Sequence, residues 1–289
     1  MSIAFVFPGQ GSQAVGMGAG LAEAFPAAKA VFDEVDDALG QKLSTLMWEG
    51  PEADLTLTEN AQPALMAVSL AAMRGLETKG FTLPGNVAYV AGHSLGEYSA
   101  LAASGALSLG DTARLLKTRG QVMQAAVPVG EGAMAALLGA DLSQAQELAE
   151  AAAQGDCCQA ANDNAPGQVV ISGKKTAIER AVALAPKFGA RRAVLLPVSA
   201  PFHCALMQPA ADAMAEALCG VTISEPAVPV VANVLAEPIT DPEAIRTRLV
   251  EQVTGMVRWR ETMQFLAGNG VNAVYEVGAG RVLTGMARR

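Results

Sequence analysis

Short, continuous apolar runs alternate with stretches of helical period along the first hundred residues. Residues 2–7 (SIAFVF) and 87–91 (VAYVA) predict buried strands, because each run is short and ends at Pro or Gly. Residues 17–39, 62–76 and 95–103 carry apolar side chains at helical spacing and predict helices. A strand, a tight turn and a helix in succession form the unit of an open parallel sheet. The pattern therefore predicts an α/β fold.

The middle of the chain follows a different order, strand-helix-strand-strand-helix-strand. The expected strands are residues 133–138, 157–161, 168–172 and 192–196, and the expected helices are residues 143–153 and 174–187. Residues 162–167 (NDNAPG) are rich in turn formers and separate the second strand from the third. This order is typical of a small ferredoxin-like (βαββαβ) unit.

Two later apolar runs, residues 228–234 and 273–277, predict strands that rejoin the first sheet. We therefore predict two domains. The large α/β domain comprises residues 1–127 and 198–289, and the ferredoxin-like domain of residues 128–197 is inserted in it.

The composition supports a folded chain and excludes several classes of protein. Of the 289 residues, 51% are hydrophobic and 17% are charged, the opposite of a disordered chain. The net charge of −8 argues against a nucleic-acid partner. The chain opens without a basic leader, and the uncharged stretch 193–211 is interrupted by three prolines. We therefore expect a cytoplasmic protein with no membrane association.

The four cysteines do not have the spacing of a metal or disulfide site. Cys157 and Cys158 are adjacent, and the chain contains no C-x-x-C motif. We expect free thiols and no bound metal.

The most informative motif is Gly92-His93-Ser94-Leu95-Gly96, which fits G-x-S-x-G. It lies between an expected strand and an expected helix, the setting of a nucleophile elbow. The helix start would place backbone N–H groups beside a developing oxyanion. Composition alone gives about 0.1 such matches in a chain of this length, so the motif depends on its context. The alternative is an ordinary N-cap serine.

A serine nucleophile needs a general base, and the chain has only two histidines. His93 is adjacent to Ser94 and would project differently from the turn, so His203 is the candidate by elimination. The alternative for His203 is a structural histidine. The acids between Ser94 and His203 have no distinctive setting; they include Asp111, Asp141, Asp156 and Asp163. A Ser–His dyad, with the imidazole oriented by a backbone carbonyl, would serve.

The loop of residues 8–13 (PGQGSQ) follows the first expected strand. Its closely spaced glycines allow the backbone to approach a ligand, and an amide N–H here could complete an oxyanion hole. A phosphate-binding loop is disfavoured, because Gly-Lys-Ser/Thr is missing.

Six motifs occur in order along the chain. They are FPGQGSQ (7–13), GHSLGEY (92–98), TRGQ (118–121), NAPGQVVISG (164–173), PFH (201–203) and QVTGMVRW (252–259). Together they resemble the malonyl-CoA:acyl carrier protein transacylase family of bacterial fatty-acid synthesis, from Phe5 to the region of Gly280. The resemblance implies a hydrolase-like parallel-sheet core with a ferredoxin-like small domain, in agreement with the predicted division.

The resemblance also implies roles for individual residues. Ser94 would carry the acyl group, His203 would act as general base, and the backbone carbonyl of Gln252 would orient His203. The backbone N–H groups of Gln10 and Leu95 would form the oxyanion hole.

Three further residues are implied to bind the substrate. Arg119 would pair with the malonyl carboxylate, and Asn162 would lie near the pocket. Phe202 stands beside the base, where many family members carry serine, and would crowd an α-methyl group.

The implied reaction is a ping-pong transfer of malonyl from malonyl-CoA to the phosphopantetheine thiol of acyl carrier protein. Coenzyme A enters as part of the substrate, no cofactor is implied, and we expect a monomer. Three alternatives remain. A methylmalonyl or polyketide acyltransferase would share the motifs, a serine hydrolase would not need Arg119, and a silent binding subunit would lack Ser94 or His203.

A local reversal of charge suggests where the carrier protein docks. Carrier proteins of this pathway are acidic, so a chain of net charge −8 needs a basic face to bind one. Residues 174–192 hold six bases and one acid. The docking candidates are Lys174, Lys175, Lys187, Arg191 and Arg192. The alternative is a solvated face that only aids solubility.

Overall fold

The computed structural model describes residues 2–198 and 200–288. Its central sheet has five strands in the order β8-β7-β2-β1-β9. The strands are β1 (Ile3–Phe7), β2 (Tyr89–Gly92), β7 (Val230–Val231), β8 (Pro238–Ile239) and β9 (Ala273–Glu276). β7, β2, β1 and β9 run parallel, and β8 pairs antiparallel at the edge. The predicted α/β class with a parallel-sheet core is confirmed.

Side-chain alternation along β1 explains why both faces of this sheet are covered. Phe5 and Phe7 belong to the largest apolar core, whereas Ala4 and Val6 belong to a second core on the other face. The first core includes α5 (Thr58–Glu77) and α6 (Leu95–Ala103), and the second includes α12 (Trp259–Gly268) and α13 (Val282–Ala287). The sheet is therefore buried between two helical layers, as a parallel sheet requires.

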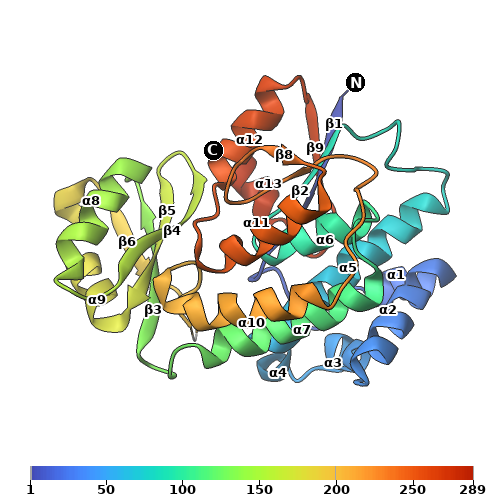
Figure 1. Ribbon diagram of the computed structural model, residues 1–289, viewed down its shortest axis with the longest axis horizontal. Helices are drawn as coiled ribbons and strands as arrows, with labels where there is room; N and C mark the ends of the chain where they lie inside the picture. Colours follow the sequence, from blue (N-terminus) through green and yellow to red (C-terminus); the bar gives the residue numbers. More distant parts are fainter. Residues whose placement is uncertain (1, 199, 289) are drawn as a thin grey trace.

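Further helices pack around the first apolar core (Figure 1). They are α1 (Ala19–Ala24), α2 (Pro26–Leu39), α3 (Leu43–Glu49), α4 (Glu52–Thr56), α7 (Leu109–Ala125), the 3-10 turn η2 (Ala205–Met207), α10 (Gln208–Cys219) and α11 (Pro242–Thr254). The single helix expected over 17–39 is divided in two. Pro26 begins α2, and Phe25 before it is extended, because proline disfavours helical backbone in the preceding residue.

A second, four-stranded antiparallel sheet lies beside the first, at the left of Figure 1. Its elements in chain order are β3 (Gly132–Leu138), α8 (Leu142–Ala153), β4 (Cys158–Ala165), β5 (Gln168–Lys174), α9 (Lys175–Leu184), η1 (Ala185–Phe188) and β6 (Arg192–Leu195). The strand order is β4-β5-β3-β6, and the sheet shares a separate apolar core with its two helices. Domain boundaries at residues 128 and 197 stay a prediction.

The turn expected over residues 162–167 is wrong for its first four residues. β4 continues to Ala165, and Asn162, Asp163 and Asn164 are buried within it. Contacts with the segment after α11 stabilise these polar residues in the strand. The N–H of Asp163 donates to the carbonyl of Val257 at 2.9 Å. Sequence patterns did not predict this extension, because its partners lie about 95 residues away.

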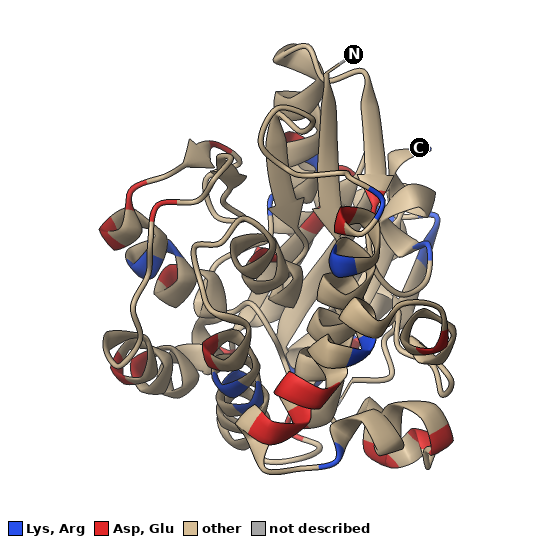
Figure 2. Cartoon of the chain, turned by 90° about the vertical axis from the view of Figure 1, so that its right-hand side faces the viewer, with Lys and Arg blue, Asp and Glu red and all other residues tan. Residues whose placement is uncertain are grey.

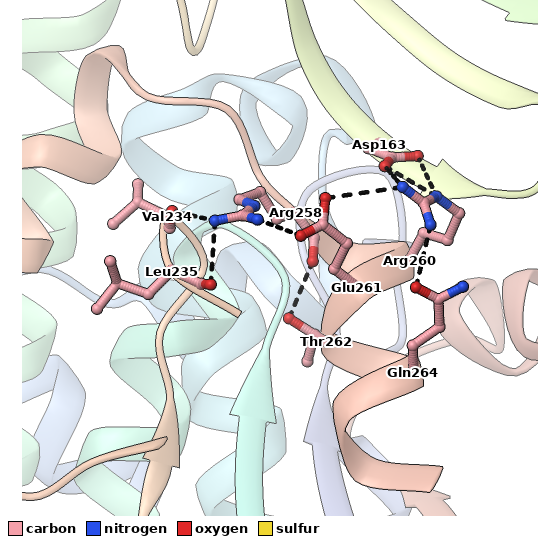
Figure 3. Close-up of polar contacts among 8 residues, drawn as sticks. All are labelled: Asp163, Val234, Leu235, Arg258, Arg260, Glu261, Thr262 and Gln264. Atoms are coloured by element: carbon pink, nitrogen blue, oxygen red, sulfur yellow. Dashed lines mark hydrogen bonds and ion pairs between the residues drawn. The ribbon is translucent and has the colours of Figure 1, made fainter. Parts of the chain in front are cut away.

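Figure 3 shows the side-chain contact that accompanies this pairing. Arg260, on α12, donates from Nε to Oδ2 of Asp163 at 2.9 Å, and its Nη2 lies 2.7 Å from the same oxygen. Asp163 is 1% exposed, so its charge is compensated by this guanidinium. The ion pair joins the second sheet to the helix that covers the first.

The strand expected over residues 228–234 is also shorter than expected. Only Val230 and Val231 form β7, and the chain turns away from the sheet at Asn233. The side chain of Asn233 binds the turn that carries Ser94, as described below.

Charged residues lie mainly on helices and loops, and the strands of the central sheet carry few of them (Figure 2). Within the described residues, no helix is long and apolar enough to cross a membrane. The same residues contain no group of three or more His, Cys, Asp or Glu side chains arranged to hold a metal ion.

Candidate active site

Ser94 occupies a strained turn between β2 and α6. Its backbone has φ 53° and ψ −113°, a conformation rare for a residue with a side chain. The two glycines of the motif are sterically required. A Cβ on Gly92 would lie 1.9 Å from the carbonyl carbon of Gly96, and a Cβ on Gly96 would lie 2.3 Å from the carbonyl oxygen of Phe7. The structure therefore has the geometry of a nucleophile elbow.

His203 lies within hydrogen-bond distance of Ser94, as expected. Ser94 Oγ and His203 Nε2 are 2.8 Å apart. The other ring nitrogen, Nδ1, is 2.9 Å from the carbonyl oxygen of Gln252 and 3.2 Å from that of Gly255. Two carbonyl acceptors require a proton on Nδ1, which leaves Nε2 unprotonated to accept the serine proton.

Burial, together with the positive charge of Arg119, lowers the pKa of His203 to about 3. The imidazole is therefore neutral at pH 7 and able to accept a proton.

Each of the four aspartates that the sequence left open is engaged outside this constellation. They are Asp111 with Ser108 and Arg114, Asp141 at the start of α8, Asp156 with Arg180, and Asp163 with Arg260. The arrangement around Ser94 is a Ser–His dyad oriented by backbone carbonyls.

The second histidine points away from the dyad. His93 Nε2 lies 2.8 Å from Oδ1 of Asn164, and its ring packs against Trp259 with centroids 5.6 Å apart. Burial lowers the pKa of His93 as well. His93 thus links the elbow to β4, and His203 remains the residue placed to serve Ser94.

Arg119, on α7, is 1% exposed and reaches the nucleophile. Its Nη2 donates to Ser94 Oγ at 3.2 Å and to Gln252 Oε1 at 2.9 Å, while Nη1 donates to Gln62 Oε1 at 2.8 Å. Burial lowers its pKa, although a guanidinium stays charged. In residues 2–198 and 200–288, no carboxylate lies within 4.0 Å of this guanidinium. A buried cation with only neutral partners is suited to receive an anion.

Asn233 and Glu97 lie behind the site, bound to its turn and to Gln252, and the sequence patterns did not predict either of them. Asn233 Oδ1 accepts the N–H of Ser94 at 2.7 Å, and its Nδ2 donates to the carbonyl of Gly92 at 2.6 Å. Glu97 Oε2 accepts from Gln252 Nε2 at 2.6 Å. Asn233 carried no signal because it lies in a loop far along the chain. Glu97 was visible inside the GHSLGEY motif, but nothing in the sequence predicted its partner.

A cavity of about 500 Å³ opens onto this constellation and contains the other predicted site residues. Its lining includes Gln10, Ser94, Leu95, Arg119, Asn162, Phe202 and His203. Gln252 lies beneath the lining and is fully buried. The structure therefore brings the predicted nucleophile, base, arginine and pocket residues together in one place.

The predicted oxyanion-hole residues come from two segments that meet at the turn. Leu95 is the first residue of α6, so its N–H has no acceptor within the helix. Gln10 belongs to the loop after β1, which approaches the elbow closely, because a Cβ on Gly9 would lie 2.7 Å from the carbonyl oxygen of His93. Both residues line the cavity.

The five basic docking candidates do not form a single patch, which corrects the expectation of one dense cluster. Lys174 is paired across the sheet with Gly132, at the start of β3, and Arg192 is paired with Leu138 at its end. Six residue steps along β3 correspond to about 20 Å. The chain places Lys175 with the first end, and Lys187 and Arg191 with the second. The sequence suggested one cluster because the five residues are close together in the chain. The strand that separates them in space, β3, lies much earlier in the chain.

Comparisons with known proteins agree with this geometry. The family described as acyl transferase domain matches residues 4–289. The chain is 48% identical to the malonyl CoA-acyl carrier protein transacylase of Escherichia coli K12, over 99% of this chain and 92% of that protein. The chain belongs to the malonyl-CoA:acyl carrier protein transacylase family. The predicted family and enzyme class, an acyltransferase, are confirmed.

Solved structures of the transacylase family share the whole fold. The acyl-carrier-protein S-malonyltransferase of Bartonella henselae is 60% identical and superposes with a TM-score of 0.98, covering 100% of this chain and 92% of that one. A further structure is a malonyl-transacylase in complex with a type II polyketide acyl-carrier protein. It is 46% identical with a TM-score of 0.96, covering 100% of this chain and 93% of that one.

Proposed function

We propose that this acyltransferase moves the malonyl group of malonyl-CoA to the phosphopantetheine thiol of acyl carrier protein, through a malonyl ester on Ser94. The observation that carries the proposal is the guanidinium of Arg119, buried without a carboxylate partner and 3.2 Å from Ser94 Oγ. A malonyl thioester presents a free carboxylate at the far end of a short acyl group. Two charge-assisted hydrogen bonds from Arg119 would hold it while Ser94 attacks the thioester carbonyl.

In the first half-reaction, Ser94 Oγ forms a bond to the thioester carbon and gives its proton to His203 Nε2. The backbone N–H groups of Leu95 and Gln10 would stabilise the oxyanion of the tetrahedral intermediate. When the intermediate collapses, the carbon–sulfur bond breaks. Coenzyme A leaves with the proton from His203, and the malonyl ester remains on Ser94.

In the second half-reaction, the thiol of the carrier protein gives its proton to the neutral imidazole of His203 and attacks the ester. Collapse of the second intermediate breaks the bond to Ser94 Oγ, which regains the proton. The scheme assigns every step to groups of this chain and of its two substrates, so it requires no metal or organic cofactor. It also draws on one copy of the chain, and we propose that the monomer is active.

The malonyl-transacylase solved with its acyl-carrier protein supports a carrier protein as acceptor for this chain. That carrier is a polyketide one, whereas the Escherichia coli relative bears only the transacylase name. We propose a fatty-acid carrier as acceptor, with a polyketide carrier as the alternative. Phe202, 9% exposed in the cavity wall, favours malonyl over the bulkier methylmalonyl group.

The test is steady-state kinetics with malonyl-CoA and a holo-acyl carrier protein, both varied, with mass spectrometry of the product. Parallel double-reciprocal lines and a malonylated carrier support the scheme. Intersecting lines would exclude a covalent ping-pong route. Release of free malonate with no malonylated carrier would indicate a hydrolase instead.

A further inference from the structure

The carboxylate of Glu97 is bound to Gln252 and Asn233, two residues that also contact Ser94, and none of the steps above uses it. Glu97 is on the first turn of α6 and is 1% exposed. Its Oε2 accepts from Gln252 Nε2 at 2.6 Å and from the backbone N–H of Asn233 at 3.1 Å. Burial raises the pKa of this carboxyl to about 7. Burying a carboxyl group in this way costs folding free energy, so the contacts of Glu97 call for an explanation.

The side-chain amide of Gln252 satisfies its neighbours in only one orientation. Its Nε2 faces oxygen acceptors, the carboxylate of Glu97 and the carbonyl of Ser94, the latter at 3.0 Å. Its Oε1 faces a donor, Arg119 Nη2, at 2.9 Å. Turning the amide over would set its oxygen against the carboxylate and its N–H groups against the guanidinium. In its ionised form, which predominates above pH 7, Glu97 therefore fixes which end of the amide meets Arg119.

The interposed amide also leaves the charge of Arg119 available. The guanidinium is held by two neutral amide oxygens, those of Gln62 and Gln252, and its Cζ lies 5.6 Å from the centroid of the Tyr98 ring. A direct ion pair with Glu97 would occupy the donors that an incoming carboxylate needs. Contact through Gln252 orients the guanidinium without pairing its charge.

We propose that Glu97 is a positioning residue that acts through Gln252 to hold Arg119 in the orientation that receives the free carboxylate of the acyl substrate. The proposal rests on the proposed function, because it takes the malonyl carboxylate as the ligand of Arg119. Glu97 itself touches no reacting atom. Its influence is therefore expected on the choice between acyl groups rather than on acyl transfer in general.

The experiment compares kcat/KM for malonyl-CoA and acetyl-CoA at a pH above 7, where Glu97 is ionised, in the wild type, Glu97→Gln and Glu97→Asp. Glu97→Gln keeps the shape but removes the charge that orients Gln252. We expect it to lower the malonyl-to-acetyl ratio about tenfold, with kcat/KM for acetyl-CoA nearly unchanged. Glu97→Asp retains the charge and should recover part of the ratio. Equal losses for both substrates, or an unchanged ratio, would overturn the proposal.

A double-mutant cycle tests the route through Arg119. In an Arg119→Ala background, Glu97→Gln should no longer change the malonyl-to-acetyl ratio. A further change in that background would show that Glu97 acts otherwise. Asp36→Asn, which alters another buried carboxylate bonded to Ser44, is the matched control for a general loss of stability. If the proposed function itself is wrong, Arg119→Ala alone would leave the malonyl-to-acetyl ratio at its wild-type value. That result distinguishes a failure of the proposed function from a failure of the role given to Glu97.

Discussion

Asn233 and Ser94 are 139 residues apart in sequence, yet Oδ1 of Asn233 accepts the backbone N–H of Ser94 at 2.7 Å. The same side chain donates from Nδ2 to the carbonyl of Gly92 at 2.6 Å. One fully buried amide therefore binds both sides of the strained elbow. These bonds stabilise a backbone conformation with φ 53° that Ser94 would otherwise seldom adopt.

Asn233→Ala should loosen the elbow and move Ser94 Oγ relative to His203. We expect kcat/KM for malonyl-CoA to fall about 10- to 100-fold, because small displacements of a nucleophile are costly. Asn233→Asp, which sets a carboxylate oxygen against the carbonyl of Gly92 and buries a charge near Glu97, should be impaired at least as much. The comparison needs a thermal melt of each variant. Wild-type kinetics in a folded Asn233→Ala protein would show that the elbow does not depend on this side chain.

Arg119→Ala should weaken malonyl transfer by about 2–4 kcal/mol, because the substrate carboxylate would lose a buried charged partner. Acetyl transfer should fall much less, since acetyl offers no carboxylate. Arg119→Lys is the matched variant, which retains the charge but not the planar pair of donors. Kinetics with both thioesters provide the measurement. Equal losses for malonyl and acetyl would remove Arg119 from substrate selection.

The raised pKa of Glu97 predicts a specific dependence of stability on pH. Its folded pKa of about 7 exceeds its ordinary value of 4.5, so the folded state binds this proton more tightly than the unfolded chain does. The resulting stabilisation is complete below pH 4.5 and is lost as the pH rises to about 7. Relative to Glu97→Gln, the wild type should therefore lose about 3 kcal/mol of unfolding free energy over this interval. Urea unfolding at several pH values measures it, and a constant difference would contradict a buried titrating Glu97.

The two separated basic groups make the docking proposal testable with an internal control. Lys174 lies 3.3 Å from Asp156, whereas in the described part of the chain Lys187, Arg191 and Arg192 form no ion pair. We therefore expect Lys187→Glu with Arg191→Glu to raise the KM for carrier protein at low salt, with acylation by malonyl-CoA unchanged. Lys174→Glu with Lys175→Glu should have a smaller effect. An unaltered KM in the first variant would place docking elsewhere.

Much of the fold and the centre of the site could be predicted from the sequence, because both depend on local patterns. The expected helix over 95–103 is α6, and the glycines around Ser94 indicated the turn that contains it. What could not be predicted depends on distant partners. The strand character of Asp163 requires Arg260 and Val257, and the role of Asn233 appears only once β7 lies beside β2.

The site residues differ in how much of their role could be predicted from the sequence around them. His203 was reached by elimination among two histidines, whereas the contact of its Nδ1 with Gln252 followed from the family resemblance and is observed in the structure. The burial of Arg119 among neutral partners required the tertiary structure, since a single arginine on a helix gives no sign of its surroundings.

The central claim is that Ser94 carries the malonyl group, and the intact mass of the protein after brief mixing with malonyl-CoA tests it most directly. The wild type should gain the mass of one malonyl group, and the adduct should disappear when holo-acyl carrier protein is added. Ser94→Ala should remain folded, since Ala adds no bulk to the elbow, and should gain no mass. A malonyl adduct of full stoichiometry on Ser94→Ala would contradict the account.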